Sequence, residues 1–383
     1  MTQTPANPHG AHLTIDLDAI VHNWQLLAAK GKKQGQGQGK GQGAECGGVV
    51  KANAYGTGIE QAGAALYRAG CRSFFVAHVT EGERLRHVAP EAVIYVLNGM
   101  PSGGAAAYQG ARLRPVLGSV EEIGEWSEHV TQAGLSGEAA IHVDTGLNRL
   151  GLDPEVWRAL AGRIGNGDYG FMPTLLITHL ASSETLDTPQ NAEQARLFAE
   201  MAELAPEIPA SFCNSSAVFR ADLPKYDLMR PGYALYGGNP TPWTSNPMRE
   251  VVRLQAPILQ IRTIEKGEKV GYNGRWQAKR PTVLVTISLG YADGFPRLPP
   301  LADQPVGEVL IGQTLCPIVG RLSMDLMIID ATDALPEHVQ RGVMVTVIGG
   351  ELDIDRVGQM AGTIGYLILT SLSPRYTRTY LGG

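Results

Sequence analysis

The stretch from Gly47 to Gly58 reads GGVVKANAYGTG, and it opens a pattern that continues to about residue 237. A short apolar run, 48–52, is followed by a helix-like segment, 59–69, and the same alternation then repeats. The runs are continuously apolar, which indicates strands buried on both faces and hence a parallel sheet covered by helices. Further candidate strands lie at residues 73–77, 93–97, 113–117, 139–143, 174–178, 210–213 and 226–230, with clear helix-like segments at 120–130 and 191–204.

The number and spacing of these units predict an N-terminal (β/α)₈ barrel. A doubly wound open sheet is the structural alternative, and the pattern alone does not exclude it. Ahead of the barrel units, residues 12–17 read as a strand, and Asp18 can cap the helix that follows. We therefore expect the barrel domain to span residues 12–240.

A low-complexity tract, GKKQGQGQGKGQGAECGG, occupies residues 31–48. It has almost no apolar side chain to bury, so we expect a mobile surface loop there. After the proline-rich segment 237–247 the sequence becomes alternating and strand-rich, and only 353–361 reads clearly as a helix. These features predict a second, mostly-β domain over residues 248–383.

Composition and charge exclude several classes of protein. Of the 383 residues, 44% are hydrophobic and 18% are charged, so the chain can bury a full core. The formal net charge of −5 argues against a nucleic-acid partner. The sequence has neither an apolar run long enough to span a membrane nor a secretory signal, and its four cysteines lack metal-ligand spacing. We expect a cytoplasmic enzyme with reduced thiols, without a metal site or a membrane partner.

Lys51 stands at the C-terminal end of the first candidate barrel strand, where catalytic groups collect in this fold. A lysine between apolar strand residues and small side chains can be partly desolvated. Desolvation lowers its pKa and frees the amine for Schiff-base chemistry. The alternative interpretation is a lysine that extends from the strand end into solvent.

The residues around Lys51, VVKANAYGTG, closely resemble the pyridoxal-phosphate motif of the alanine racemase family. A single short motif would be weak evidence, but the other matching motifs occur in the family's order and in both predicted domains. They are HVDTGLNRLG (142–151), THLASSE (178–184), NSSA (214–217), MRPGYALYGG (229–238), VGYNGRW (270–276), SLGYADGFPR (288–297), VGRLSMDLMIID (319–330) and GTIGYLILTSLSPR (362–375).

The resemblance implies a fold-type III enzyme that uses pyridoxal 5′-phosphate and acts on a small amino acid. It also implies a head-to-tail homodimer, in which the barrel of one subunit and the β domain of the other share each active site. Lys51 would hold the cofactor covalently and take the α-proton from the D-enantiomer. Tyr272 of the partner subunit would take it from the L-enantiomer on the opposite face, with His179 hydrogen-bonded to that tyrosine. Taken alone, the Tyr272 motif would be a plain hairpin turn.

The same resemblance assigns the remaining site residues. Arg230 would donate to the pyridine nitrogen of the cofactor, and since arginine keeps its proton, the ring would be a weaker electron sink that favours racemisation. Arg149 would lie near the cofactor's phenolic oxygen and the substrate carboxylate, and Met324 and Asp325 would narrow the pocket from the partner subunit. The cofactor's phosphate end would meet Tyr55, Asn214, Ser215, Gly232, Tyr233 and Tyr366.

Two positions depart from the family pattern. His142 stands where many members have a carbamylated lysine that braces the arginine corresponding to Arg149, so we expect another group, such as a bound anion, to orient Arg149. Thr57 stands where the motif usually has histidine, and we expect it to face away from the reacting carbons.

The leading interpretation is an alanine racemase that supplies D-alanine for peptidoglycan. A broader-specificity amino-acid or serine racemase of the same fold is the first alternative. A related decarboxylase or aldolase would lack a tyrosine in the context of Tyr272. A pyridoxal-phosphate homeostasis protein would resemble the barrel alone, so the predicted second domain argues against it.

Overall fold

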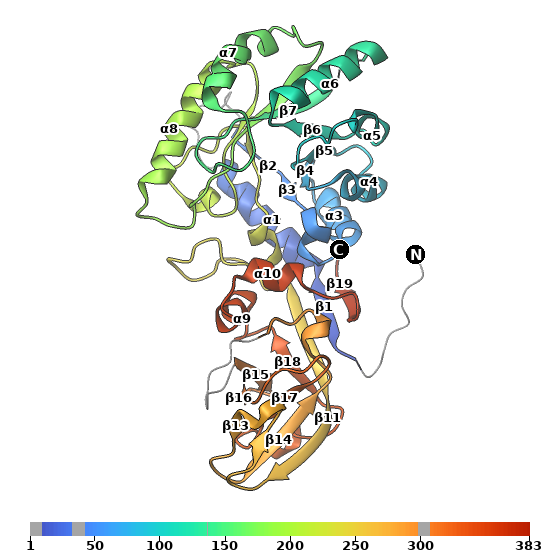
Figure 1. The fold of residues 1–383 in the computed structure, drawn as a ribbon, viewed down its shortest axis with the longest axis vertical. Coiled ribbons are helices and arrows are strands. Elements are labelled where there is room, and N and C mark those ends of the chain that lie inside the picture. The colour runs from blue at the N-terminus through green and yellow to red at the C-terminus, as the bar shows by residue number, and fades with distance from the viewer. Residues whose placement is uncertain (1–9, 33–42, 136, 298–306) are drawn as a thin grey trace.

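The chain forms two domains stacked along the long axis of the molecule, which is vertical in Figure 1. The structure, a computed structural model, describes residues 10–32, 43–135, 137–297 and 307–383. Most of the expected mobile loop, at residues 33–42, lies outside the described residues. In the parts of the chain that are described, no helix is both long and apolar enough to cross a membrane.

The first domain is built on a parallel sheet whose strands β3 to β9 follow one another in sequence order. The central strands are mostly buried on both faces, which explains their continuously apolar sequences. The strands of this domain are β2 (Glu45–Cys46), β3 (Gly48–Val49), β4 (Ser73–Val76), β5 (Val93–Val96), β6 (Arg114–Leu117), β7 (Glu138–His142), β8 (Met172–Ile177), β9 (Ala210–Ser211) and β10 (Leu228–Met229).

Strand β10 closes this sheet into a barrel. On one side, the N–H of Arg230 donates to the carbonyl of Cys213, beyond β9, at 2.9 Å. On the other side β10 pairs in parallel with β2, and the N–H of Val49 donates to the carbonyl of Pro231 at 3.0 Å. The closure confirms the (β/α)₈ barrel and excludes the open sheet. It also corrects the expected loop, because the end of the low-complexity tract forms β2 and the start of β3.

Helices cover the outside of the barrel (Figure 1), and polar side chains cap several of them. Ser119 accepts the N–H of Glu122 at the start of α6, and Asp153 accepts the N–H of Glu155 at the start of α7. The helices expected at 59–69, 120–130 and 191–204 are α3, α6 and α8. The longer helices of this domain are α1 (Leu17–Lys32), α3 (Ile59–Arg68), α4 (Val79–Val88), α5 (Ala105–Gly110), α6 (Val120–Ala133), α7 (Pro154–Gly165) and α8 (Pro189–Glu203).

The second domain is a closed antiparallel barrel, which confirms its mostly-β character. Its strands run in the order β14, β17, β16, β15, β18, β11, and β11 pairs again with β14 to close the sheet. The strands are β11 (Val252–Ile264), β12 (Lys269–Val270), β13 (Trp276–Gln277), β14 (Thr282–Ile287), β15 (Gly307–Ile311), β16 (Thr314–Ile318), β17 (Met327–Asp330), β18 (Met344–Ile348) and β19 (Thr377–Leu381).

The N-terminal strand belongs to the sheet of the second domain. β1 (His12–Asp16) forms close to where the sequence predicts it, but it pairs antiparallel with β11 and parallel with β19. The cap of α1 also differs from the prediction. The carboxylate of Asp16 accepts the N–H of Ala19 at 2.8 Å, whereas Asp18 accepts the N–H of Gly383 at 3.0 Å.

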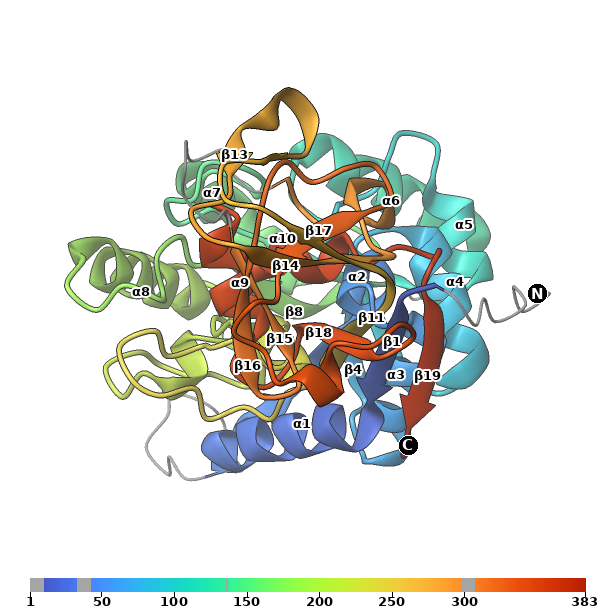
Figure 2. The ribbon, with the colours of Figure 1, turned by 90° about the horizontal axis from the view of Figure 1, so that it is seen from below.

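Two helices of the second domain lie next to the barrel. α9 (Ile354–Met360) is the expected helix, whereas α10 (Gly365–Thr370) was not predicted. Figure 1 shows α10 between the two domains, and it contacts the short α2 (Lys51–Tyr55) of the barrel. Figure 2 looks along the long axis and shows the second domain in front of the barrel. One hydrophobic cluster contains buried residues of both domains, so they share a core.

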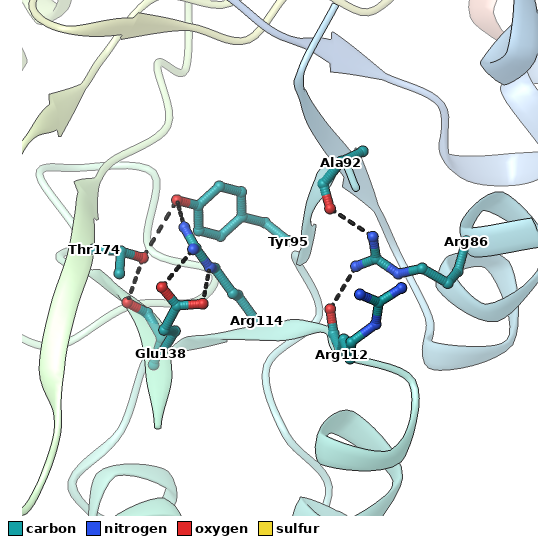
Figure 3. A network of polar contacts seen from close by, with 8 residues as sticks. Arg86, Ala92, Tyr95, Arg112, Arg114, Glu138 and Thr174 are labelled. Carbon is teal, nitrogen blue, oxygen red and sulfur yellow. Dashed lines mark hydrogen bonds and ion pairs between the residues drawn. The ribbon is translucent and has the colours of Figure 1, made fainter. Parts of the chain in front are cut away.

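Polar networks hold the N-terminal edge of the barrel sheet, at the starts of β5 to β8 (Figure 3). The guanidinium of Arg86, from α4, donates to the carbonyls of Ala92 at 2.6 Å and of Arg112, and so ties α4 to the segments before β5 and β6. Beside it, Arg114 pairs with Glu138 at 2.6 Å across β6 and β7. Arg86 also donates to the carbonyls of Ala89, Pro90 and Ala111.

We expect Arg86→Met to lower the free energy of unfolding by about 2 kcal/mol, because it removes the guanidinium donor from several carbonyls, of which those of Ala89, Ala92 and Ala111 are partly buried. Arg196→Met is the matched control, since exposed Arg196 pairs with Glu200 on the surface of α8 and the loss of this pair should cost less than about 1 kcal/mol. Urea unfolding of both variants checks this. Equal effects would show that Arg86 does not brace the barrel edge.

Candidate active site

A cavity of about 780 Å³ lies at the C-terminal ends of the barrel strands and reaches α10 of the second domain. Val49, His142 and Ile177, the last residues of β3, β7 and β8, contribute to its wall. Tyr272 and the Met324–Asp325 pair, expected from the second domain, do not line it. All the residues expected to contact the cofactor do line it: Lys51, Tyr55, Arg149, His179, Asn214, Ser215, Arg230, Gly232, Tyr233 and Tyr366.

Lys51 begins a turn of left-handed backbone shortly after β3. Residues 52–55 all have φ between 52° and 56° although none is glycine. This conformation costs about 1–2 kcal/mol per residue, so surrounding contacts must hold it. The candidate strand 48–52 was therefore too long: the strand ends at Val49, and Lys51 belongs to the turn.

Polar contacts from the following barrel units hold this turn. Oδ1 of Asn53 accepts an N–H of Arg84 at 2.9 Å, and the N–H of Asn53 donates to Glu81 at 3.3 Å. The hydroxyl of Thr57 donates to the carbonyl of Ala54 at 2.6 Å, so Thr57 closes the turn and does not line the cavity. The contacts of Glu81 and Arg84 were not predicted, because nothing in their local sequence shows which turn they contact.

Lys51 lines the cavity and is half-buried, so it does not extend freely into solvent. Burial lowers the pKa of Lys51, and the charge of Arg149 lowers it further, whereas Glu81 raises it. A lowered pKa increases the neutral fraction of the amine near pH 7. That is the form a lysine needs to attack a carbonyl or accept a proton.

Arg230 is a buried, fixed cation of the same cavity. Its guanidinium donates to the hydroxyl of Ser211 and to the carbonyl of Thr178, and it lies 6.0 Å from the ring centre of Phe75. Burial lowers the pKa of Arg230 to about 10. The side chain therefore stays protonated at pH 7 and can donate hydrogen bonds but cannot accept them.

Two histidines of the cavity are kept uncharged. Burial, together with the charges of Arg230 and Arg149, lowers the pKa of His142 to about 4 and that of His179 to about 3. His142 therefore supplies no negative charge where a carbamate would stand. Arg149 nevertheless lines the cavity beside Lys51, and a smaller cavity of about 290 Å³ adjoins both Arg149 and His142.

The segments after β9 and β10 form a cradle with room for an anion. A Cβ on Gly232 would lie 2.4 Å from the hydroxyl of Tyr55, so only glycine leaves this space open. Oγ of Ser215 accepts the N–H groups of Gly232 and Ala234, at 3.0 and 3.2 Å, and can donate its own proton to a ligand. With Tyr366 nearby, these donors fit the phosphate of pyridoxal 5′-phosphate.

Two of the expected cofactor contacts use their side chains within the protein. Oδ1 of Asn214 accepts the hydroxyl of Ser183 at 2.8 Å. The hydroxyl of Tyr233 donates to Asp355 of α9 at 2.7 Å. Among the described residues, no group of three His, Cys, Asp or Glu side chains could hold a metal ion.

The second-domain residues lie at the surface. Tyr272 is 65% exposed in the turn between β12 and β13, so the local hairpin forms as its Asn-Gly sequence suggests. Met324 is 55% exposed, in the loop before β17. Arg375 pairs with Asp325 at 2.8 Å and with Asp293 at 3.2 Å, and so fixes this loop. Arg375 ends the motif 362–375, but its pairing with this loop was not predicted from the sequence.

Comparisons with known proteins agree with the motifs. The family descriptions "Alanine racemase, N-terminal domain" and "Alanine racemase, C-terminal domain" match residues 15–240 and 251–380. The chain is 51% identical over 380 residues to the alanine racemase of Methylobacterium nodulans, covering 99% of this chain and 98% of that protein.

The chain belongs to the alanine racemase family. Membership confirms the resemblance drawn from the motifs, and with it the expectation of a pyridoxal-phosphate-dependent isomerase. A crystal structure of alanine racemase from Bartonella henselae, with covalently bound pyridoxal phosphate, is 37% identical with a TM-score of 0.88 and covers 97% of this chain and 99% of that one. The biosynthetic alanine racemase of Pseudomonas aeruginosa is 31% identical with a TM-score of 0.86, over 98% and 100% of the two chains.

His142 gives this alanine racemase family member a predictable dependence on pH. The folded-state pKa of about 4 lies below the ordinary value near 6.5, so the unfolded chain binds the proton first as the pH falls. The stability from neutral His142 is complete above about pH 6.5 and is lost as the pH falls toward 4. Arg230 and Arg149 deepen the shift, whereas Asp144 opposes it.

The unfolding free energy of the unsubstituted protein should fall between pH 7.5 and pH 5. We expect this fall to be about 2 kcal/mol smaller in His142→Gln, because the variant has no histidine to protonate at this position. His87→Gln, on the exposed face of α4, is the control and should leave that loss unchanged. Urea unfolding at the two pH values provides the measurement. The same pH dependence in both variants would show that His142 titrates normally in the folded protein.

Proposed function

We propose that this chain interconverts L- and D-alanine at a site completed by a second copy, with Lys51 of one copy and Tyr272 of the other as the two bases. The observation that carries the proposal is a half-built site. The barrel cavity contains a desolvated lysine among cationic and phenolic side chains, whereas Tyr272 is exposed outside its lining. Racemisation needs a proton acceptor on each face of the α-carbon, and a second copy would supply the other face.

Four groups of this chain would hold the cofactor. Lys51 would bind it covalently, Arg230 would donate to its pyridine nitrogen, and the cradle at Ser215 and Gly232 would receive its phosphate. When bound, pyridoxal 5′-phosphate supplies a conjugated ring that delocalises the negative charge left on the α-carbon. Arg230 keeps its own proton at neutral pH, so it orients and does not transfer a proton.

The proton steps follow from the charges of the site. The amine of Lys51, with its lowered pKa, would take the α-proton of D-alanine and return it in the reverse reaction. Tyr272 of the second copy would act in the same way on L-alanine. His179, neutral because its pKa is lowered to about 3, can share a hydrogen bond with that phenol without adding charge. Arg149 would bind the substrate carboxylate.

We propose a head-to-tail homodimer as the active form. Support comes from large side chains that are exposed around the cavity mouth and on the second domain. Ile364, just before α10, is 62% exposed, and Leu367 of α10, next to the cavity-lining Tyr366, is 45% exposed. Exposed Tyr272 and Met324 would face the partner's cavity in such a dimer. Surfaces of this composition usually bind protein.

Alanine is the proposed substrate among amino acids. Met324, with Tyr291 and Tyr366, would narrow the entrance and admit a small side chain, which disfavours the broader-specificity alternative. We propose a cytoplasmic enzyme whose D-alanine serves peptidoglycan synthesis, and the four free cysteines, all buried, agree with a reducing compartment.

The direct test is a racemisation assay on alanine, serine, lysine and arginine with pyridoxal 5′-phosphate. We expect alanine to be the best substrate. Lys51→Ala should lose both the absorbance of protein-bound cofactor and the activity, because Lys51 is the one lysine among the described residues that line the cavity. Retained absorbance would remove Lys51 as the attachment site, and faster racemisation of another amino acid would replace alanine as the substrate.

Tyr272→Phe should keep the bound-cofactor absorbance but lose racemisation from L-alanine more than proton abstraction from D-alanine. Solvent deuterium incorporation at the α-carbon measures the two directions separately, because Lys51 can still act on the D-enantiomer. Equal loss in both directions, or none, would contradict the assignment of Tyr272 as a base.

Mixing the two variants tests whether the site is shared. A mixed dimer of Lys51→Ala and Tyr272→Phe contains one intact site, so equal amounts should recover about one quarter of the unsubstituted activity after subunit exchange. Each variant mixed with itself is the control. Without recovery in a mixture that forms dimers, the two bases belong to the same chain.

A further inference from the structure

A row of four tyrosine rings crosses the phosphate end of the cavity. Tyr233 stacks on Tyr366 with ring centres 3.9 Å apart and an angle of 9° between the planes. Tyr366 lies 6.1 Å from Tyr55, and Tyr55 stacks on Tyr236 at 4.7 Å. The row ends at the barrel backbone, where the hydroxyl of Tyr236 donates to the carbonyl of Val49 at 3.0 Å.

The other end of the row is fixed by a carboxylate of the second domain. Oδ1 of Asp355, in the first turn of α9, accepts the hydroxyl of Tyr233 at 2.7 Å. Oδ2 accepts the N–H of Asn239 at 2.8 Å, so both oxygens of the carboxylate are used. Tyr233 itself is buried, with a relative exposure of 5%. A charge-assisted hydrogen bond of this kind sets the position of the ring that makes it.

Two glycines leave the space that Tyr233 fills. A Cβ on Gly365, the first residue of α10, would lie 1.8 Å from the hydroxyl of Tyr233. A Cβ on Gly238 would lie 2.1 Å from its ring. The phenol therefore sits against the backbone from which α10 begins, one residue before Tyr366. Tyr366 is itself 42% exposed, so its stacking on Tyr233 is a main constraint on its ring.

We propose that Tyr233 and Asp355 are positioning residues for the phosphate end of the site. The Asp355–Tyr233 hydrogen bond fixes the ring on which Tyr366 stacks, and thereby directs the Tyr366 hydroxyl toward the cradle at Gly232 and Ser215. The α9–α10 unit of the second domain thus tunes phosphate binding in the barrel of the same chain. This inference rests on the proposed use of pyridoxal 5′-phosphate.

Comparing two ligands isolates the phosphate contact. Pyridoxal can also react with Lys51 but lacks the phosphate. We expect Tyr233→Phe and Asp355→Asn each to raise the Kd for pyridoxal 5′-phosphate about tenfold and to change the Kd for pyridoxal less than about twofold. Absorbance titration of the protein freed of cofactor measures both constants. Both variants preserve side-chain shape, so either one tests the inference if the other fails to fold.

Tyr95→Phe is the matched control. It removes a hydroxyl that contacts Thr174 and Arg114 at the N-terminal edge of the barrel, and it should leave the ratio of the two Kd values unchanged. The inference would be overturned if Tyr233→Phe and Asp355→Asn changed neither Kd, or if they raised the Kd values of both ligands by the same factor. In the latter case the pair supports only the fold.

Tyr366→Phe completes the test as a double-mutant cycle. If Tyr233 acts through the Tyr366 hydroxyl, adding Tyr233→Phe to Tyr366→Phe should cause little further loss of phosphate-dependent affinity. Additive losses would show that Tyr233 acts independently and would overturn the inference. Unsubstituted protein that shows no preference for pyridoxal 5′-phosphate over pyridoxal would instead contradict the proposed cofactor site, which separates the two failures.

Discussion

The site depends on an accumulation of positive charge in a partly buried cavity. Lys51, Arg149 and Arg230 line the same space, and each lowers the tendency of neighbouring groups to bind a proton. Burial is the larger cause and these charges add to it, so the pKa values of His142 and His179 are low enough to keep both neutral, and the pKa of Lys51 is lowered toward its reactive form. Buried like charges are costly without a counter-charge. The arrangement is therefore complementary to an anionic ligand, and we propose that the glycine cradle and the phenols beside it receive its phosphate end.

The fold was largely readable from the sequence, because burial on both faces leaves continuous apolar runs at the barrel strands. The strand prediction was wrong at residues 50–52, where the apolar run continues but the strand has ended. The left-handed turn that begins there has no local sequence signal, because it depends on contacts of Asn53 with Glu81 and Arg84. Helix α10 was not predicted from the sequence, because apolar side chains also occupy its exposed face and the helix therefore lacks a clear amphipathic pattern. The residue that caps α1 is Asp16 and not the predicted Asp18, because the preceding strand ends at Asp16, one residue earlier than the pattern suggested.

The sequence motifs predicted which residues contact the cofactor, and all of these residues line the cavity. What they could not show is which groups hold those residues in place. Asp355 and Tyr233 are far apart in the sequence, as are Arg375 and Asp325, and each pair meets only because α9 and the C-terminal segment pack back on earlier parts of the chain. Such contacts leave no periodicity or spacing to read. The Asp355–Tyr233 hydrogen bond also links the second domain to the barrel, whereas the Arg375–Asp325 pair lies within the second domain.

The position of β1 has a consequence for how the protein is made. Residues 12–16 leave the ribosome well before their sheet partners, which are β11 and, at residues 377–381, β19. The strand cannot pair until β11 and β19 have been synthesised, whereas the barrel units can pair with their neighbours as they emerge. Completion of the sheet of the second domain is therefore a late step of folding, and β1 has no sheet partner until β11 and β19 have emerged.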